Sequence, residues 1–192
     1  ETGNVISSAG AMNPQIRFGE DLMSRVSYSM MNSGGADEMT VAVRDGLNSL
    51  FNQVAEEAKV DKDLIMDSVF VCNPVMHHLL IGVDPFELGQ APFALTTSQS
   101  LNLFSKDLGL NINPLAKSYM LPCIAGHVGA DAAAVALSEA PNLSNDLVLI
   151  VDVGTNAEIM LSKEGEVYAT SSPTGPAFEG AEISSGVRAT YG

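Results

Sequence analysis

The sequence predicts an α/β protein in which short strands alternate with helices. Apolar residues recur on one helical face over residues 37–58 and charges occupy the other face, which is typical of an amphipathic helix. Residues 68–72 and 118–121 are short apolar runs of the kind that form strands. Residues 147–151 are wholly apolar, as expected for a strand in a sheet that is covered on both faces.

The segments between these runs supply the other elements. Leu22, Val26 and Met30 recur every four residues and predict a helix over residues 19–31. Pro74 stands near the first turn of a short helix expected over residues 75–81. The other expected elements are a strand over residues 5–11, a loop over residues 84–97, a helix over residues 101–108 that ends at Gly109, and an alanine-rich helix over residues 126–138.

A β-hairpin is predicted near the carboxyl end of the sequence. Residues 157–161 and 166–170 flank a four-residue connection that ends in Gly165, which is typical of a hairpin turn. A loop over residues 171–178 then leads into a helix that begins near Glu179.

The composition favours a packed core and narrows the range of partners. Hydrophobic residues make up 46% of the chain and charged residues 17%. A formal net charge of −14 at pH 7 opposes binding to nucleic acid and to anionic membranes, because both are negatively charged. The sequence has neither a membrane-spanning apolar run nor a signal peptide at its amino terminus. We therefore expect a soluble cytoplasmic protein.

The cysteines and the paired histidines argue against a metal centre within this chain. Cys72 and Cys123 are the only cysteines and neither belongs to a Cys-x-x-Cys pair, so they are expected to be buried, reduced thiols. His77 and His78 would point about 100° apart on a helix, which favours a structural role over a shared metal ion.

The clearest candidate site is the sequence Asp152-Val153-Gly154-Thr155, which follows the apolar run. A carboxylate at the end of a buried strand can hold a Mg²⁺-bound water, and a glycine lets the backbone approach a phosphate closely. The threonine adds hydroxyl and N–H donors. Because aspartate and glycine are also common turn residues, the pattern alone leaves a phosphate-binding turn and a plain tight hairpin both open.

Two further features are weaker on their own. Residues 174–180, with Gly175 and Gly180, form either an anion-binding loop before a helix or an ordinary connection from strand to helix. Asp131 is the only acid in a long uncharged stretch, and it is either a residue that starts a helix or a carboxylate aimed into a cleft.

Several motifs occur in one order that resembles the actin, sugar kinase and heat-shock ATPase superfamily. More closely, the chain resembles the carboxy-terminal region of the reductive activators of corrinoid proteins. The matching segments, which together span nearly the whole chain, are Asn13-Pro14-Gln15-Ile16-Arg17-Phe18-Gly19-Glu20-Asp21, Asn73-Pro74-Val75-Met76-His77-His78-Leu79-Leu80, Leu121-Pro122-Cys123-Ile124-Ala125-Gly126-His127-Val128-Gly129-Ala130-Asp131, Asp152-Val153-Gly154-Thr155-Asn156-Ala157-Glu158-Ile159 and Gly175-Pro176-Ala177-Phe178-Glu179-Gly180-Ala181.

This resemblance implies an actin-like (ribonuclease H-like) ATPase fold and an ATP-driven electron transfer. Members of that family carry a [2Fe–2S] ferredoxin domain, a linker and this module, and they use ATP to restore Co(I) in a corrinoid methyl-transfer protein. The resemblance makes Asp152 a ligand of magnesium and phosphate. It makes Asp131 a catalytic carboxylate of the cleft, and it places the remaining nucleotide-binding positions at Gly154, Thr155, Asn156, Gly175 and Gly180.

The resemblance also implies that the fold is incomplete. Residues 1–140 would be a first-lobe region without its opening hairpin, and residues 141–192 the start of a second lobe with the phosphate-binding hairpin. The cluster cysteines would lie in a missing upstream domain, and open sheet edges favour a homodimer. A small-molecule kinase of the same superfamily and a non-catalytic interaction module are the alternatives.

Overall fold

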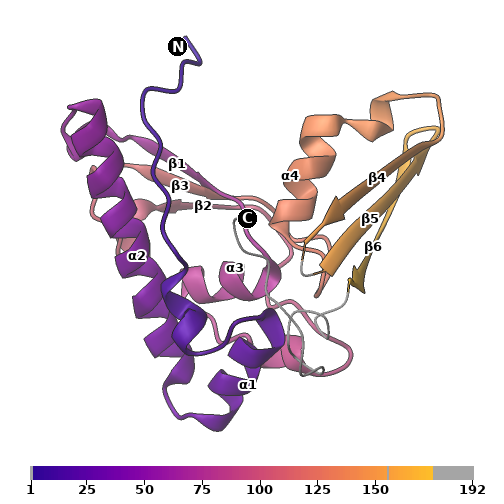
Figure 1. Ribbon diagram of the computed structural model, residues 1–192, viewed down its shortest axis with the longest axis horizontal. Helices are drawn as coiled ribbons and strands as arrows, with labels where there is room; N and C mark the ends of the chain where they lie inside the picture. Colours follow the sequence, from indigo (N-terminus) through magenta and orange to yellow (C-terminus); the bar gives the residue numbers. More distant parts are fainter. Residues whose placement is uncertain (1, 155, 175–192) are drawn as a thin grey trace, which may run out of the picture. The chain divides into compact units, whose positions relative to one another are not determined.

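The computed structural model describes residues 2–154 and 156–174. The chain divides into two compact units between residues 131 and 132. Unit 1 contains α1 (Leu22–Met31), α2 (Gly35–Ala58), α3 (Pro74–Ile81), the 3-10 helices η1 (Pro14–Arg17), η2 (Lys62–Leu64), η3 (Phe86–Gly89) and η4 (Ser105–Leu108), and the strands β1 (Asp67–Phe70), β2 (Leu101–Phe104) and β3 (Lys117–Met120). Unit 2 contains η5 (Pro141–Leu143), β4 (Val148–Val153), β5 (Asn156–Lys163), β6 (Glu166–Pro173) and most of α4 (Ala130–Glu139), which begins in unit 1 (Figure 1). In the described part, no helix has the length and apolar character needed to cross a bilayer.

Helices and strands both contribute to the core, so the predicted α/β class is confirmed. The sheet of unit 1 has the order β1-β3-β2, with β1 parallel and β2 antiparallel to β3. The strands predicted over residues 68–72 and 118–121 correspond to β1 and β3. Parallel pairing brings the carboxyl ends of β1 and β3 together, with Phe70 opposite Met120.

The helix predicted over residues 101–108 is wrong in its first half. Residues 101–104 form β2, in which Leu101 and Leu103 are half-buried and Asn102 and Phe104 are exposed. That two-residue period fits a strand, and the ladder with β3 pairs one edge of its backbone. Only the following turn is helical, and it ends at Gly109 with a φ of 67° as expected.

Side-chain caps fix where the helices of unit 1 begin. Asp21 accepts the Ser24 N–H at the start of α1, and Asn73 accepts the Met76 N–H at the start of α3. The helices predicted over residues 19–31, 37–58 and 75–81 are confirmed as α1, α2 and α3. They share a core, whose fully buried members are Val26, Met39, Val75, Leu79 and Leu88.

The strand predicted over residues 5–11 is wrong. These residues have no regular secondary structure, and Val5 is 86% exposed. The segment runs along α2 (Figure 1), where the Ser7 hydroxyl donates to the Val54 carbonyl at 2.9 Å. A strand needs a neighbour for its backbone groups, and none of the described residues provides one for this segment.

The alanine-rich helix begins four residues later than predicted, at Ala130. Residues 124–128 form a tight turn, in which the Ile124 and Ala125 N–H groups both donate to the Val128 carbonyl. A Cβ atom on Gly126 would overlap the Phe93 carbonyl oxygen. This close approach explains why a glycine precedes the helix without belonging to it.

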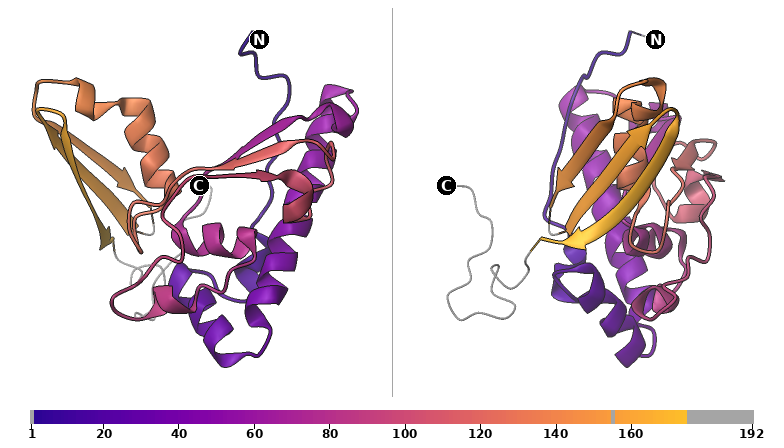
Figure 2. Two further views of the ribbon diagram at one scale, coloured as in Figure 1. Left: turned by 180° about the vertical axis from the view of Figure 1, so that it is seen from behind. Right: turned by 90° about the vertical axis from the view of Figure 1, so that its right-hand side faces the viewer.

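Unit 2 is a meander of β4, β5 and β6 (Figure 2). The predicted hairpin is confirmed, but its strands are longer than predicted and only Glu164 and Gly165 connect them. Both residues have positive φ, 53° and 87°, which suits the two-residue turn of a twisted hairpin. The helix expected near Glu179 lies outside the described residues.

The two faces of this meander differ in burial. On one face Met160 and Ser162 are buried, and the Ser162 hydroxyl donates to the Pro141 carbonyl in η5. The opposite face exposes Leu149, at 62%, and Val151, at 47%. In the described part, therefore, β4 is covered on one face only, although its wholly apolar sequence predicts cover on both.

Candidate functional site

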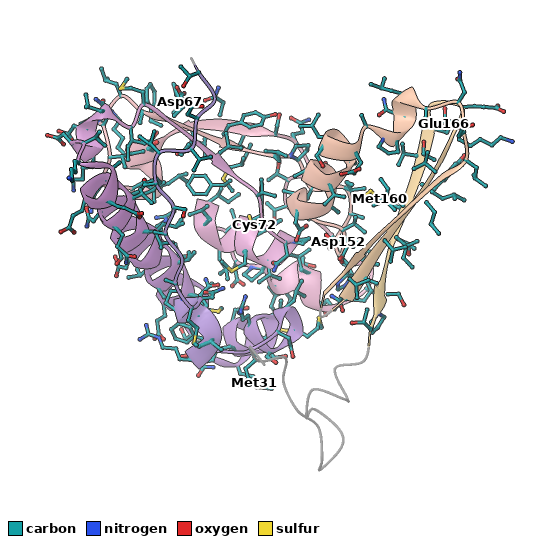
Figure 3. The ribbon with its side chains drawn as sticks, turned by 45° about the horizontal axis from the view of Figure 1, so that its top comes forward. Met31, Asp67, Cys72, Asp152, Met160 and Glu166 are labelled. Atoms are coloured by element: carbon teal, nitrogen blue, oxygen red, sulfur yellow. The ribbon has the colours of Figure 1, made fainter. Side chains whose placement is uncertain are left out.

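Asp152 lies at the exposed carboxyl end of β4 (Figure 3). The apolar residues before it anchor the strand through the face that contains buried Met160. The strand therefore holds the Asp152 backbone in place while its carboxylate reaches solvent, as a residue that binds an ion must.

The backbone beside Asp152 turns tightly through Gly154. The Gly154 N–H donates to the Asn156 carbonyl at 2.7 Å, and its own carbonyl accepts the Thr174 hydroxyl at 2.7 Å. Among the described atoms, a Cβ on Gly154 would meet only the Asn156 oxygen, at 3.5 Å, an ordinary contact. Packing therefore does not require glycine here, and its absent side chain leaves room for a ligand to approach the turn, although the Gly154 N–H is already paired with Asn156.

Glu158 is a second carboxylate at this end of the sheet, and the sequence argument did not single it out. It stands directly opposite Asp152 in the antiparallel register of β4 and β5. Its Oε1 atom accepts the Ser171 hydroxyl at 3.0 Å. Two carboxylates on one face provide the oxygen donors that hard cations such as Mg²⁺ prefer. Only the strand register reveals this pairing.

The described residues contain part of the predicted nucleotide site. Asp152, Gly154 and Asn156 are brought together at one turn. Thr155, Gly175 and Gly180 lie outside the described residues, so their predicted roles remain predictions.

Asp131 lies in the first turn of α4, beside the carboxyl ends of two parallel strands. The Cys72 carbonyl, just beyond β1, accepts the N–H groups of Ala130 and Asp131 at 3.0 and 3.3 Å. A Cβ on Gly129 would come within 2.5 Å of the Asp131 carboxylate and 2.8 Å of Asn73 Cα. Glycine thus lets the Asp131 side chain settle close to the start of α3. The carboxyl ends of parallel strands are where α/β proteins commonly bind ligands.

The two thiols next to Asp131 are kept protonated. Burial raises the pKa of Cys72 to about 12, and the neighbouring Cys123 thiol and the Asp131 carboxylate add to the effect. Burial likewise raises the pKa of Cys123 to about 11, again with a contribution from Asp131. Both are free cysteines, Cys72 half-buried and Cys123 buried. Because thiolates are the reactive and metal-binding form, these thiols are not suited to nucleophilic chemistry.

The two histidines are buried within unit 1. Burial lowers the pKa of His77 to about 4, with a further contribution from His78, and burial also lowers the pKa of His78. Both ring nitrogens of His77 lack hydrogen-bond partners among the described residues. The Leu121 backbone nevertheless lies close enough to raise the pKa of His77, against the effect of burial. In the described part of the chain, no three His, Cys, Asp or Glu side chains are grouped to hold a metal ion.

Two regions of one known family match consecutive parts of the chain. Residues 1–142 match the RACo middle region, and residues 146–192 match the C-terminal domain of RACo, the ASKHA domain. The chain belongs to the RACo family. The ASKHA match gives this α/β RACo chain an actin-like fold, as the order of its motifs predicts.

Individual RACo relatives agree with this assignment. The chain is 33% identical over 193 residues to the corrinoid activation enzyme RamQ of Eubacterium limosum. It is 39% identical over 71 residues to the [Co(II) methylated amine-specific corrinoid protein] reductase of Methanosarcina barkeri. A solved structure of a reductive activator for a corrinoid, iron–sulfur protein superposes with a TM-score of 0.87 at 31% identity and covers 100% of this chain.

This RACo chain spans about a third of the length of the relatives that it matches throughout. It covers 32% of RamQ and 30% of the chain in the solved structure, compared with 13% of the Methanosarcina reductase.

Proposed function

We propose that this chain is the actin-like part of an ATP-dependent reductive activator, which restores Co(I) in a corrinoid methyl-transfer protein. The observation that carries the proposal is the match along the whole chain to a corrinoid activation enzyme at 33% identity. The partner would be the corrinoid protein of a methyltransferase system. The electron would come from a [2Fe–2S] cluster held outside residues 1–192.

The exposed turn after β4 would bind the nucleotide. Asp152 and Glu158 present carboxylate oxygens on one face, which suits Mg²⁺, and the missing side chain of Gly154 leaves room for phosphate beside the turn. Thr155, Asn156, Gly175 and Gly180 would complete this site. Mg·ATP, once bound, would supply the free energy of phosphoryl transfer, and the residues of this chain would hold and orient its phosphates.

Asp131 would be the catalytic carboxylate of the first-lobe region. Its place beside the carboxyl ends of β1 and β3 supports a ligand-facing role. We assign residues 1–140 to the first lobe and residues 141–192 to the second. The junction between the two family matches, at residues 142–146, supports a boundary in this region.

The first lobe would be completed by at least one strand from outside residues 1–192. Among the described strands β1 pairs only with β3, and Val69 on β1 is 63% exposed. A groove of about 500 Å³ lies between β1 and α2. Leu47, Leu50, Phe51 and Val54 line its helical side. An added strand at β1 would cover this groove and give residues 5–11 a neighbour.

Two further expectations concern the state of the protein. The unpaired thiols Cys72 and Cys123 support a reducing compartment, the cytoplasm. The uncovered apolar face of β4 supports self-association of the isolated chain into a homodimer, with further second-lobe elements covering the same face in a longer protein.

The test is reduction of the corrinoid protein by a full-length RACo protein that carries this chain. With a reductant and Mg·ATP present, the conversion of Co(II) to Co(I) is followed by absorption. Asp152→Asn should abolish the ATP-dependent reduction, whereas Asp146→Asn, at an exposed acid just before β4, should leave it unchanged. Full ATP-dependent reduction by Asp152→Asn would contradict the proposal. ATP consumption that depends on a sugar or on acetate, without the corrinoid protein, would favour the kinase alternative.

A further inference from the structure

His78 joins two separate stretches of backbone through its imidazole ring. Its Nδ1 atom lies 2.7 Å from the Pro74 carbonyl oxygen, and the Thr96 N–H donates to its Nε2 atom at 3.0 Å. A carbonyl can only accept a hydrogen bond and an amide N–H can only donate one. The ring must therefore be neutral, with its single proton on Nδ1.

The segment bound by Thr96 is the long connection between α3 and β2. Its first part is held by apolar packing, because Leu88 in η3 is buried against Val26 in the core. Its later part has fewer such anchors, since Thr96 itself is exposed and Leu95 only half-buried. The hydrogen bond to His78 therefore attaches residues 90–98 to α3 beside the packing of Leu95 on the core.

The same segment supports the turn that precedes Asp131. The Phe93 ring meets the His127 ring edge-on, with centroids 4.6 Å apart. The Phe93 carbonyl lies where a side chain on Gly126 would have to be. Any release of residues 90–98 from α3 therefore removes the contacts that Phe93 makes with Gly126 and His127.

We propose that His78 makes a pH-sensitive contact, which holds residues 90–98 against α3 while the imidazole ring is neutral and releases them when the ring is protonated. A second proton must go to Nε2, because Nδ1 already carries one. Nε2–H and the Thr96 N–H would then be two donors facing each other with no acceptor between them. The same proton would also place a charge on a ring that is 1% exposed.

Burial favours the neutral state of His78 more than any charged or titratable group on the neighbouring elements does. On its own helix the neighbour is His77, with ring centroids 5.7 Å apart, and a second positive charge there would repel the first. On α2 the charged side chain of Arg44 reaches α3, where it donates to the Leu80 carbonyl. On the connecting segment, Asp84 and Glu87 are exposed. Burial is the main cause that lowers the pKa of His78, so release is triggered by acid.

A histidine that merely fills the core would not have these properties, because it would titrate without changing the exchange of one particular amide. The test is ¹⁵N NMR of the labelled chain between pH 7 and pH 4. At pH 7 the His78 spectrum should show a protonated Nδ1 and an unprotonated Nε2. As His78 titrates, exchange of the Thr96 amide, corrected for its intrinsic pH dependence, should accelerate about tenfold.

Two amides serve as internal controls. The Leu88 N–H donates to the Pro85 carbonyl at 2.9 Å in η3, outside residues 90–98, and the Val83 N–H donates to the His78 carbonyl at 2.8 Å. Neither acceptor titrates, so the corrected exchange of both amides should stay within about twofold over this range. A proton on Nε2 at pH 7 would overturn the proposal, as would Thr96 exchange that follows Leu88 throughout.

A matched pair of variants completes the test. In His78→Phe the Thr96 amide should exchange fast at pH 7 and lose its pH response, because no acceptor remains. In His77→Phe, which changes an equally buried neighbour whose ring nitrogens have no hydrogen-bond partner among the described residues, the pH response of Thr96 should persist. Equal behaviour of the two variants would overturn the proposal. If His78→Phe does not fold, the spectra of the unmodified chain still decide the question.

Discussion

Asp152 and Glu158 face each other across the first two strands of unit 2. The antiparallel register pairs them directly, so both side chains lie on one face of the sheet at the end where the chain turns through Gly154. Directly opposed residues have Cβ atoms about 4.5–5.5 Å apart. Two carboxylates at that spacing repel each other without a cation, and they offer a cation two donors when one is present.

Glu158→Gln is expected to stabilise the chain when magnesium is absent, by about 0.2–1 kcal/mol. The substitution removes the charge that opposes Asp152 but keeps an oxygen that can accept the Ser171 hydroxyl. The measurement is urea-induced unfolding at pH 7 and low salt, with and without Mg²⁺. Any stabilisation by Mg²⁺ should be smaller in the variant.

Glu166→Gln is the matched control for that prediction. Glu166 is an exposed acid in the same sheet, but it stands opposite Lys163 and not opposite another acid. Its loss should therefore cost a few tenths of a kcal/mol or nothing measurable. A clear destabilisation by Glu158→Gln would show that the opposed carboxylates do not repel each other in the folded chain.

Gly154→Ala is expected to separate ligand binding from folding. An added Cβ would meet only an ordinary contact at 3.5 Å among the described atoms, so the free energy of unfolding should change by less than about 0.5 kcal/mol. Nucleotide-dependent activity of the full-length protein should fall, because the methyl group occupies the backbone surface proposed to meet phosphate.

Gly126→Ala is expected to behave in the opposite way. Its Cβ would overlap the Phe93 carbonyl, and the required shift should cost about 1–3 kcal/mol in urea-induced unfolding. Gly10→Ala, where no described atom lies within 4 Å, provides the baseline for a harmless substitution. Equal stability of the Gly126 and Gly10 variants would rule out this account of the turn.

Acid should destabilise the chain through His77. Its pKa is about 4 in the folded chain and about 6.5 in an unfolded chain. Between these values the unfolded chain binds more protons, so the contribution of His77 is fully present above pH 6.5 and is lost as the pH falls to about 4. The loss is on the order of 3 kcal/mol.

The difference between the unmodified chain and His77→Phe isolates this effect from the titration of carboxylates. The ring of His77 is fully buried and its nitrogens have no partners in the described part, so an apolar ring of similar size should fit. The stability advantage of the variant should grow from pH 7 to pH 4. A constant difference over that range would mean that His77 keeps its ordinary pKa in the folded chain.

The sequence predicted the elements whose signals lie within a few neighbouring residues. Its predictions failed where pairing with a distant strand decides the secondary structure. α2 followed from its apolar face, and the β5–β6 hairpin followed from its turn residues. Residues 101–104 are too short for periodicity to separate strand from helix, and pairing with β3 decided the outcome. Residues 5–11 have strand-forming composition but no neighbouring strand among the described residues.

The sequence likewise predicted some residues of the candidate site and not others. Asp152 and Gly154 could be identified from their position after an apolar run, since that signal lies within a few residues. Glu158 could not, because only the register of β4 with β5 sets it against Asp152. The setting of Asp131 depends on the Cys72 carbonyl, 59 positions earlier in the sequence, which spacing alone does not reveal.

The uncovered face of β4 is expected to drive self-association of the isolated chain. Leu149 and Val151 are 62% and 47% exposed, and Leu161 on the next strand extends the same apolar surface. Exposed apolar surface of this kind favours contact with a second copy. Sedimentation velocity should therefore show a dimer at concentrations of tens of micromolar. Leu149→Lys should convert this dimer to a monomer, because burial of the lysine charge in the interface is costly.

Leu143→Lys is the matched control. It places the same charge at a leucine that is 80% exposed in η5, away from this face, and should leave the dimer intact. A monomer in the unmodified chain, or equal loss of the dimer in both variants, would assign the apolar face of β4 no part in self-association.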